Sequence, residues 1–246
     1  MKTLLAAAAL LVSSLAFAQT PAAARRRAVR PETQPIVHHT VTLTPSKDNT
    51  LYQTVDGSIS NGSGAHIFAG ATGRGELRRA LLAFNITSQI PQGSQVTRVV
   101  LTLNVSASIA GAQPMSLHRV TADWGEGASI AFSGFSWGNS DGRGTAAMAG
   151  DATWIHTFFP DQRWTKPGGD FDAPPDATTT TAAFQYTWES PAMITRVQQW
   201  LDQPSTNFGW IVIGTEPATR TAKRFDSREI AQQRTAPALL IEFDSR

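Results

Sequence analysis

Charged residues gather shortly before the end of this chain. The stretch "RFDSREIAQQRTAPALLIEF" places Arg228 and Glu229, with Arg224 and Asp226 just before them, ahead of an apolar run. Such a cluster could be catalytic, or it could be an ion network that holds the final strand. Arg228 and Glu229 are adjacent, so on a strand they would point to opposite faces and would not converge on a substrate. We therefore predict a structural ion network that joins Arg228 and Glu229 to Arg78 and Arg79 of the segment "LRRALLAF".

Pairs of carboxylates are the other candidates for catalysis. Asp123 and Glu126 flank a tryptophan in "DWGEG", and Asp170 and Asp172 lie in "GGDFDAPPD". A glycoside hydrolase needs two carboxyl groups on opposite sides of a sugar, which spacing along the chain does not establish. Carboxylates beside glycines are more often turn residues. The sequence therefore predicts no catalytic residue, and a polysaccharide-cleaving enzyme is the less favoured alternative.

Calcium ligands are offered by the same acidic stretch. Asp170, Asp172 and Asp176 supply carboxylate oxygens at short spacing, and calcium accepts such ligands in flexible geometry. The stretch is not an EF-hand loop, because Pro175 stands where that loop needs glycine. Two alternatives therefore stay open. Either these three aspartates bind a structural calcium ion, or the protein has no cofactor. Thiolate metal sites are excluded, because the chain has no cysteine.

Alternating polar and apolar residues dominate the chain from residue 37 onward. In "VTRVVLTLNVS" the residues Val99, Leu101 and Leu103 fall on one face, a period of two that is typical of half-buried antiparallel strands. One segment is helical, because Ser190 can cap it and Pro191 suits the first helical position. About ten short strands with one short helix predict an all-β fold, a jelly-roll-type antiparallel β-sandwich.

Residues 125–180 interrupt this alternation with a long insertion rich in aromatic residues. Such a segment either folds back over the sandwich or forms a binding surface, since it is too aromatic for a loose linker. Sugar rings stack on indole faces, and basic side chains bind the acid groups of a uronate polymer. The residues that we predict to bind carbohydrate are Trp137, Trp154, Trp164, Arg143, Arg163 and Lys166.

The N-terminal region differs in composition from the remainder. Residues 1–18 have the short basic start, apolar run and Ala-x-Ala ending of a signal peptide, which predicts export to the periplasm or the outside. Residues 19–36 are rich in arginine, alanine and proline and are predicted to be a disordered linker before a single domain, 37–246. Five of the 21 Lys and Arg lie in residues 1–30, which leaves 16 against 19 Asp and Glu. We expect a monomer that neither spans a membrane nor binds nucleic acid.

Several segments together resemble one known family. In chain order they are "DNTLYQ", "RRALLAFNITSQIPQGSQVTRVVLTLNV", "VTADWGEG", "GDATW", "WTKPGGDF", "MITRVQQWLDQPSTNFGWIV" and "FDSREIAQQRTAPALLIEF". They span most of residues 40–243 and resemble the DNRLRE-domain proteins, secreted β-sandwich modules related to disaggregatase repeats and to alginate-associated carbohydrate-binding modules. The resemblance implies a jelly-roll module that is often appended to polysaccharide-degrading enzymes. We therefore expect a secreted, non-catalytic module that binds polysaccharide. A structural or adhesive surface protein, in which the same aromatic residues are buried, is the alternative.

Overall fold

Short strands and one α-helix make up the part of the chain that the computed structural model describes, residues 34–132 and 141–246. The chain divides into two units, Met1–Gln34 and Pro35–Arg246, and the fold is that of the second unit. The predicted signal peptide and most of the predicted linker lie outside the described residues. The strands are β1 (Val37–Leu43), β2 (Lys47–Tyr52), β3 (Ile59–Ser60), β4 (His66–Ala71), β5 (Leu77–Ala83), β6 (Gln95–Ser108), β7 (Gln113–Arg119), β8 (Thr145–Ala146), β9 (His156–Phe158), β10 (Gln162–Arg163), β11 (Ala177–Thr181), β12 (Gln185–Glu189), β13 (Trp210–Ile213), β14 (Lys223–Asp226) and β15 (Ala238–Ser245). The helix is α1 (Pro191–Asp202), and the short 3₁₀ turns are η1 (Ile86–Ser88), η2 (Asp141–Arg143), η3 (Pro204–Thr206) and η4 (Gln233–Thr235).

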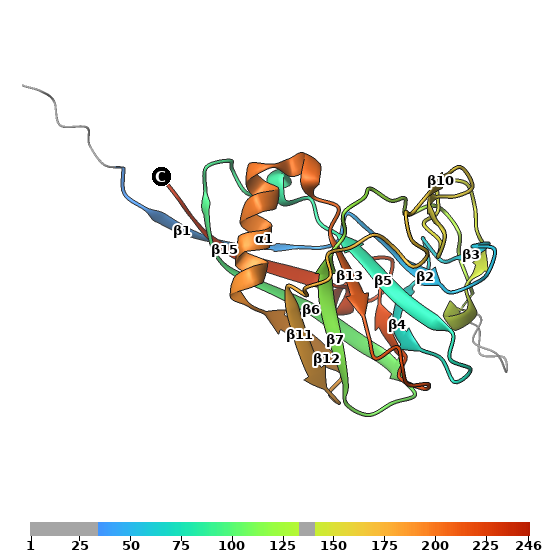
Figure 1. The fold of residues 1–246 in the computed structure, drawn as a ribbon. Coiled ribbons are helices and arrows are strands. Elements are labelled where there is room, and N and C mark those ends of the chain that lie inside the picture. Colours follow the sequence, from blue (N-terminus) through green and yellow to red (C-terminus); the bar gives the residue numbers. More distant parts are fainter. Residues whose placement is uncertain (1–33, 133–140) are drawn as a thin grey trace, which may run out of the picture. The chain divides into compact units, whose positions relative to one another are not determined.

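Most strands join one antiparallel sheet that curls on itself (Figure 1). Along the sheet the order is β1-β15-β6-β14-β4-β5-β13-β7-β11, while β12 also pairs with β6 and β2 with β5. The curl brings β11 close to β12, where the Thr179 hydroxyl donates to the Thr187 carbonyl at 2.7 Å. The predicted all-β, antiparallel sandwich with a single short helix is therefore confirmed.

The first and last strands pair with each other at one edge of the sheet. Val37 lies opposite Ser245, and Leu43 lies opposite Leu239. β1 is exposed along most of its length, as expected for a strand with a neighbour on one side only. The final strand, β15, is held from its other side by β6.

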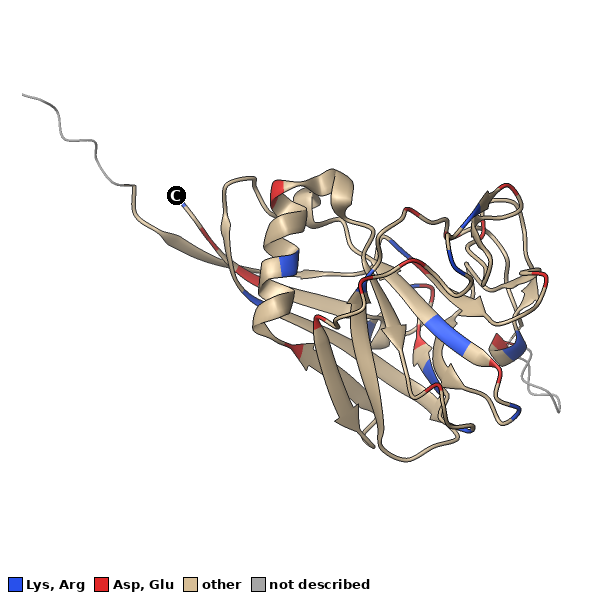
Figure 2. Cartoon of the chain, in the orientation of Figure 1, with Lys and Arg blue, Asp and Glu red and all other residues tan. Residues whose placement is uncertain are grey.

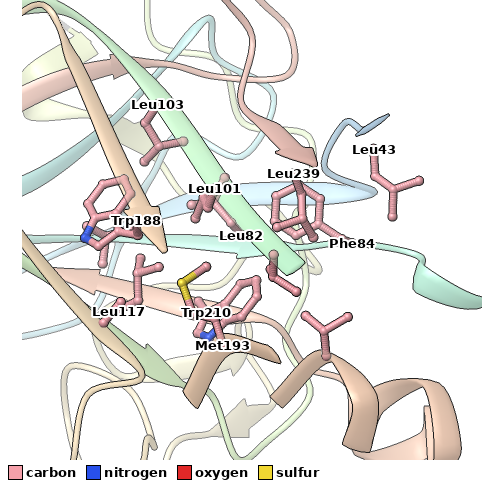
Figure 3. Close-up of a cluster of buried hydrophobic side chains, with 14 of the residues drawn as sticks. Leu43, Leu82, Phe84, Leu101, Leu103, Leu117, Trp188, Met193, Trp210 and Leu239 are labelled. Carbon is pink, nitrogen blue, oxygen red and sulfur yellow. The ribbon is translucent and has the colours of Figure 1, made fainter. Parts of the chain in front are cut away.

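The main hydrophobic core lies inside the curled sheet (Figure 3). On β6 the side chains of Val99, Leu101 and Leu103 are fully buried, while the residues between them are partly exposed. This alternation is the one that the sequence predicts. The same core contains Trp188 of β12 and Trp210 of β13, whose large apolar surfaces contribute much of the burial.

Helix α1 closes one side of this core. Its first turn is capped by Ser190, whose hydroxyl oxygen accepts a hydrogen bond from the Met193 N–H at 3.1 Å, and Pro191 occupies the first turn. The buried face of the helix is apolar and includes Met193 and Trp200. The indole of Trp200 meets that of Trp210 edge-on, with ring centroids 4.5 Å apart. The predicted cap and start of the helix are confirmed.

A second, smaller core lies on the outer face of β2, β5 and β13. Leu51, Leu81 and Ile211 from these strands pack with Trp154 and Trp164 of the insertion. Residues 125–180 were expected either to fold back over the sandwich or to form a binding surface. The described part of this insertion folds back over the sandwich.

Candidate binding groove and carboxylate cluster

The two described tryptophans among those predicted to stack on sugar do not form an exposed platform. Trp154 and Trp164 are 7% and 5% exposed, and Trp137 lies outside the described residues. The Trp164 indole N–H donates to the Thr153 carbonyl at 2.9 Å. The Arg79 guanidinium lies 4.9 Å from the centre of the Trp154 ring and covers one of its faces. The two described indoles are needed to cover apolar side chains on the outer face of the sheet, so they do not offer a flat face to solvent.

Three surface hollows lie in a row across the ends of β2, β4 and β5. The first has a volume of about 200 Å³ and lies between Phe68 and Lys223. The second, of about 380 Å³, shares Thr72, Arg78 and Gly142 with the first. The third, of about 460 Å³, shares Gln53, Thr54 and Glu76 with the second and reaches Trp154 and Pro167. Neighbouring hollows share wall residues and are therefore adjacent, and we call the row of three the groove.

The walls of the groove are predominantly basic, and Figure 2 shows basic residues around β4 and β5. Its positively charged residues are Arg74, Arg78, Arg143, Lys223 and Arg224. Only Glu76 and Asp141 contribute negative charge to the same described walls. Of the residues predicted to bind an acidic glycan, Arg143 lies in the groove. Arg163 is exposed on β10 and Lys166 is exposed next to Pro167, and neither lines these hollows.

The cations of the groove are of two kinds. Lys223 is buried, and its Nζ donates to Ser108 Oγ at 3.0 Å and to the carbonyls of Ala110 and Gly111 at 3.1 and 2.7 Å. Burial lowers the pKa of Lys223, so its charge is fixed in place at some electrostatic cost. Arg74 and Arg143 are exposed, and in the portion of the chain that is described neither side chain forms an ion pair. These two guanidinium groups are therefore available to a ligand.

A second feature is a cluster of three carboxylates built from distant segments. Asp48 is the second residue of β2, Glu126 follows β7, and Glu229 follows β14. Each offers an oxygen, and the three oxygens lie within 4.8 Å of one another. Arg228 joins the cluster, with its Nε 2.6 Å from Glu126 Oε1 and 2.7 Å from Glu229 Oε1. We call these four residues the carboxylate cluster.

The prediction that Arg228 and Glu229 diverge is wrong. β14 ends at Asp226, so both residues lie in the turn after the strand, where adjacent side chains can converge. Arg228 and Glu229 are also not joined to Arg78 and Arg79. Arg79 binds Glu216 through Nε at 2.6 Å and Nη2 at 2.8 Å. Arg78 lies over Tyr52 and reaches Glu76 at 3.4 Å. The predicted single network is thus three separate ones.

The aspartates predicted to bind calcium are engaged by other groups. Asp170 accepts hydrogen bonds from the backbone N–H groups of Thr165 and Lys166 at 2.8 and 3.1 Å. Asp172 lies 3.6 Å and Asp176 3.0 Å from the guanidinium of Arg196. The three do not form a common ligand set, because Asp170 is turned towards its own loop.

Asp123 and Glu126, the first pair considered for catalysis, are each paired with a cation. Asp123 Oδ1 lies 2.7 Å from Lys47 Nζ, and Glu126 is bound by Arg228.

No helix among the described residues is long and apolar enough to cross a membrane.

A scan of protein-family models and a search of curated proteins each find no match. The resemblance to the DNRLRE-domain proteins therefore stays a prediction.

Burial sets the electrostatics of the carboxylate cluster. It raises the pKa of Asp48 well above its usual range, and the nearby Glu229 carboxylate adds to the effect. Burial also raises the pKa of Glu229. The Asp48 carboxylate is nevertheless tied to the chain, since its Oδ2 accepts from the Arg228 N–H at 2.8 Å.

Replacing Asp48 with asparagine, with a metal chelator present, is expected to raise the free energy of unfolding at pH 8 by about 1–3 kcal/mol. The amide keeps an acceptor for the Arg228 N–H and no longer repels Glu229. In the native chain the raised pKa means that the folded state binds the Asp48 proton more tightly than the unfolded state. That contribution is present below the unfolded pKa and is lost as the pH rises through the folded pKa. Urea unfolding between pH 5 and 8 should therefore show a flatter profile for the variant.

Asp123→Asn is the matched control, because it removes the same charge from a neighbouring position that is 58% exposed at its side chain. Its pH profile should follow that of the native chain. A loss of stability in Asp48→Asn at pH 8 would contradict this account of the cluster.

Proposed function

We propose that this protein is a non-catalytic module that binds acidic polysaccharide along the groove. The observation that carries the proposal is the row of three adjacent hollows whose described walls hold five cationic and two anionic side chains. A polymer needs an extended surface rather than a closed pocket, and a row of linked hollows supplies one. A uronate polymer carries a carboxylate on each ring, which suits a row of cations.

The two kinds of cation have different roles in this proposal. Arg74 and Arg143 bind carboxylates through charge-assisted hydrogen bonds, for which the planar guanidinium is well shaped. Lys223 and Arg78 are held by the protein and provide a fixed positive field at little further entropic cost. Phe68 at one end and Pro167 at the other give apolar contacts for the C–H faces of sugar rings. Export to the periplasm or the outside, where such polymers occur, belongs to the same proposal.

The second candidate is a structural or adhesive surface protein. The burial of Trp154 and Trp164 favours it, because that burial takes two of the three predicted indoles out of an aromatic platform for sugar. The two candidates differ in whether any polysaccharide is retained, and in whether the groove cations matter.

The test is binding to a panel of acidic and neutral polysaccharides, with alginate and pectin against xylan and chitin. We expect selective retention of the acidic polymers in affinity electrophoresis. The double variant Arg74→Gln/Arg143→Gln should bind about tenfold more weakly, a loss of about 1.4 kcal/mol. Both side chains are exposed, so the variant should fold normally, and a thermal melt checks this.

The matched control is Arg163→Gln/Arg234→Gln, which removes the same charge from exposed positions outside the groove. Equal weakening in both double variants would mean that net charge, rather than the groove, attracts the polymer. Retention of no polysaccharide at all would contradict the proposal and leave the adhesive candidate.

A further inference from the structure

The carboxylate cluster carries more negative charge than its protein partners neutralise. Three carboxylates, those of Asp48, Glu126 and Glu229, meet one guanidinium, that of Arg228. Asp48 is fully buried, while the other two are half-buried. Gathering like charges away from water is unfavourable unless a counter-charge accompanies them. With all three carboxylates ionised, the cluster lacks two positive charges.

An independent observation concerns the hydrogen bonding of Asp48. Asp48 is 0% exposed, and within the described part of the chain its Oδ1 has no hydrogen-bond partner. A buried carboxylate oxygen without a partner is rare, because desolvation leaves it uncompensated. The other oxygen, Oδ2, is already engaged by the Arg228 N–H. Oδ1 is therefore an oxygen that is ready for a ligand with positive charge.

Hydrogen bonds from neighbouring backbone and side-chain groups hold the carboxylates in position. Glu126 Oε1 accepts from the Asp48 N–H at 2.9 Å, and the Glu126 carbonyl accepts from Asn49 Nδ2 at the same distance. The Glu229 carboxylate accepts from Ser227 Oγ at 3.2 Å. Each carboxylate is thus held by at least one hydrogen bond, and Glu126 accepts from Arg228 through both oxygens. This limits the entropy lost when a ligand orders them.

We propose that Asp48, Glu126 and Glu229 bind one divalent cation, and that the ion is calcium. All three ligands are hard carboxylate oxygens, which favour Ca²⁺ or Mg²⁺ over transition metals. Calcium suits the site better because it accepts several carboxylates in irregular geometry, whereas magnesium needs a near-octahedral shell and keeps its waters. Two positive charges balance the cluster. The ion links β2, the loop after β7 and the turn after β14, which are far apart in sequence.

The test uses the full chain freed of metal by chelator and titrated with calcium chloride. Calorimetry should show one ion per chain, and the melting temperature should be higher by about 5 °C in saturating calcium than in chelator. Asp48→Asn and Glu229→Gln should each weaken calcium binding at least tenfold while still folding, since both keep the size of the side chain. Magnesium should bind more weakly than calcium.

The control variant is Asp170→Asn/Asp172→Asn, which removes two carboxylates from the acidic stretch that first indicated calcium. It should keep the full calcium response. The proposal is overturned if calcium changes neither heat nor melting temperature, or if the control loses the response while Asp48→Asn keeps it. A chain that is stabilised by acid but not by calcium would show that a bound proton balances the cluster instead. None of these readouts involves polysaccharide, so the result does not depend on the proposed function.

Discussion

Replacing Asp176 with alanine is expected to destabilise the protein by about 3–5 kcal/mol, the cost of breaking a buried charged pair. Asp176 is 7% exposed and its carboxylate binds two partners. Arg196 donates to it through Nε at 3.0 Å and Nη2 at 3.1 Å, and the Trp210 indole N–H donates at 2.8 Å. Alanine leaves both donors without their acceptor. Urea unfolding followed by tryptophan fluorescence measures the loss.

Two comparisons separate this role from metal binding. Asp170→Ala removes a carboxylate that accepts only two backbone hydrogen bonds at a more exposed position, so about 1 kcal/mol is expected. The loss in Asp176→Ala should be the same in calcium and in chelator, since Arg196 and Trp210 already occupy both carboxylate oxygens. A loss below about 1 kcal/mol would mean that the Arg196 pair contributes little, as exposed ion pairs do.

Replacing Trp164 with alanine is expected to cost a similar amount, about 3–5 kcal/mol, because a buried indole leaves a large cavity. Trp164 packs with Leu51 and Ile211 in the outer core, and its N–H satisfies the Thr153 carbonyl. The variant should therefore melt earlier and expose the outer face of β5. Thermal unfolding and chemical denaturation both report this loss.

Trp164→Phe keeps most of the packing and removes the hydrogen bond to Thr153, so about 1 kcal/mol is expected. The comparison bears on how binding data are interpreted. Weaker polysaccharide binding in Trp164→Ala would follow from loss of structure and is no evidence for sugar stacking. An unchanged melting temperature in Trp164→Ala would contradict the buried role.

The regular elements could be predicted because their signals are local. The alternation of Val99, Leu101 and Leu103 fixes the buried face of β6, and Ser190 with Pro191 fixes the start of α1. The burial of the two described insertion tryptophans, Trp154 and Trp164, could not be predicted from such local signals. Whether Trp154 and Trp164 are buried depends on Leu81 and Ile211, which face away from the main core. These two residues belong to strands that are far apart in sequence.

The carboxylate cluster was hidden from sequence for a related reason. Asp48 and Arg228 are 180 positions apart, yet they share a hydrogen bond. The segment "DSRE" did attract attention by its charge, but its partners Asp48 and Glu126 lie in other segments. The groove cations Arg74 and Lys223 carry no local signal, because an isolated basic residue in a turn or strand is ordinary. In both cases the topology of the sheet creates the site.

The pairing of β1 with β15 has a mechanical consequence. Val37 and Ser245 are opposite each other, so the outer ends of the two terminal strands emerge at the same point of the sheet. A tension applied between them would load the β1–β15 hydrogen bonds one after another, as in a zipper, rather than all together in shear. β1 would peel away at low force, while β15 remains held by β6. Pulled in this way, the domain would lengthen by one strand before its core yields.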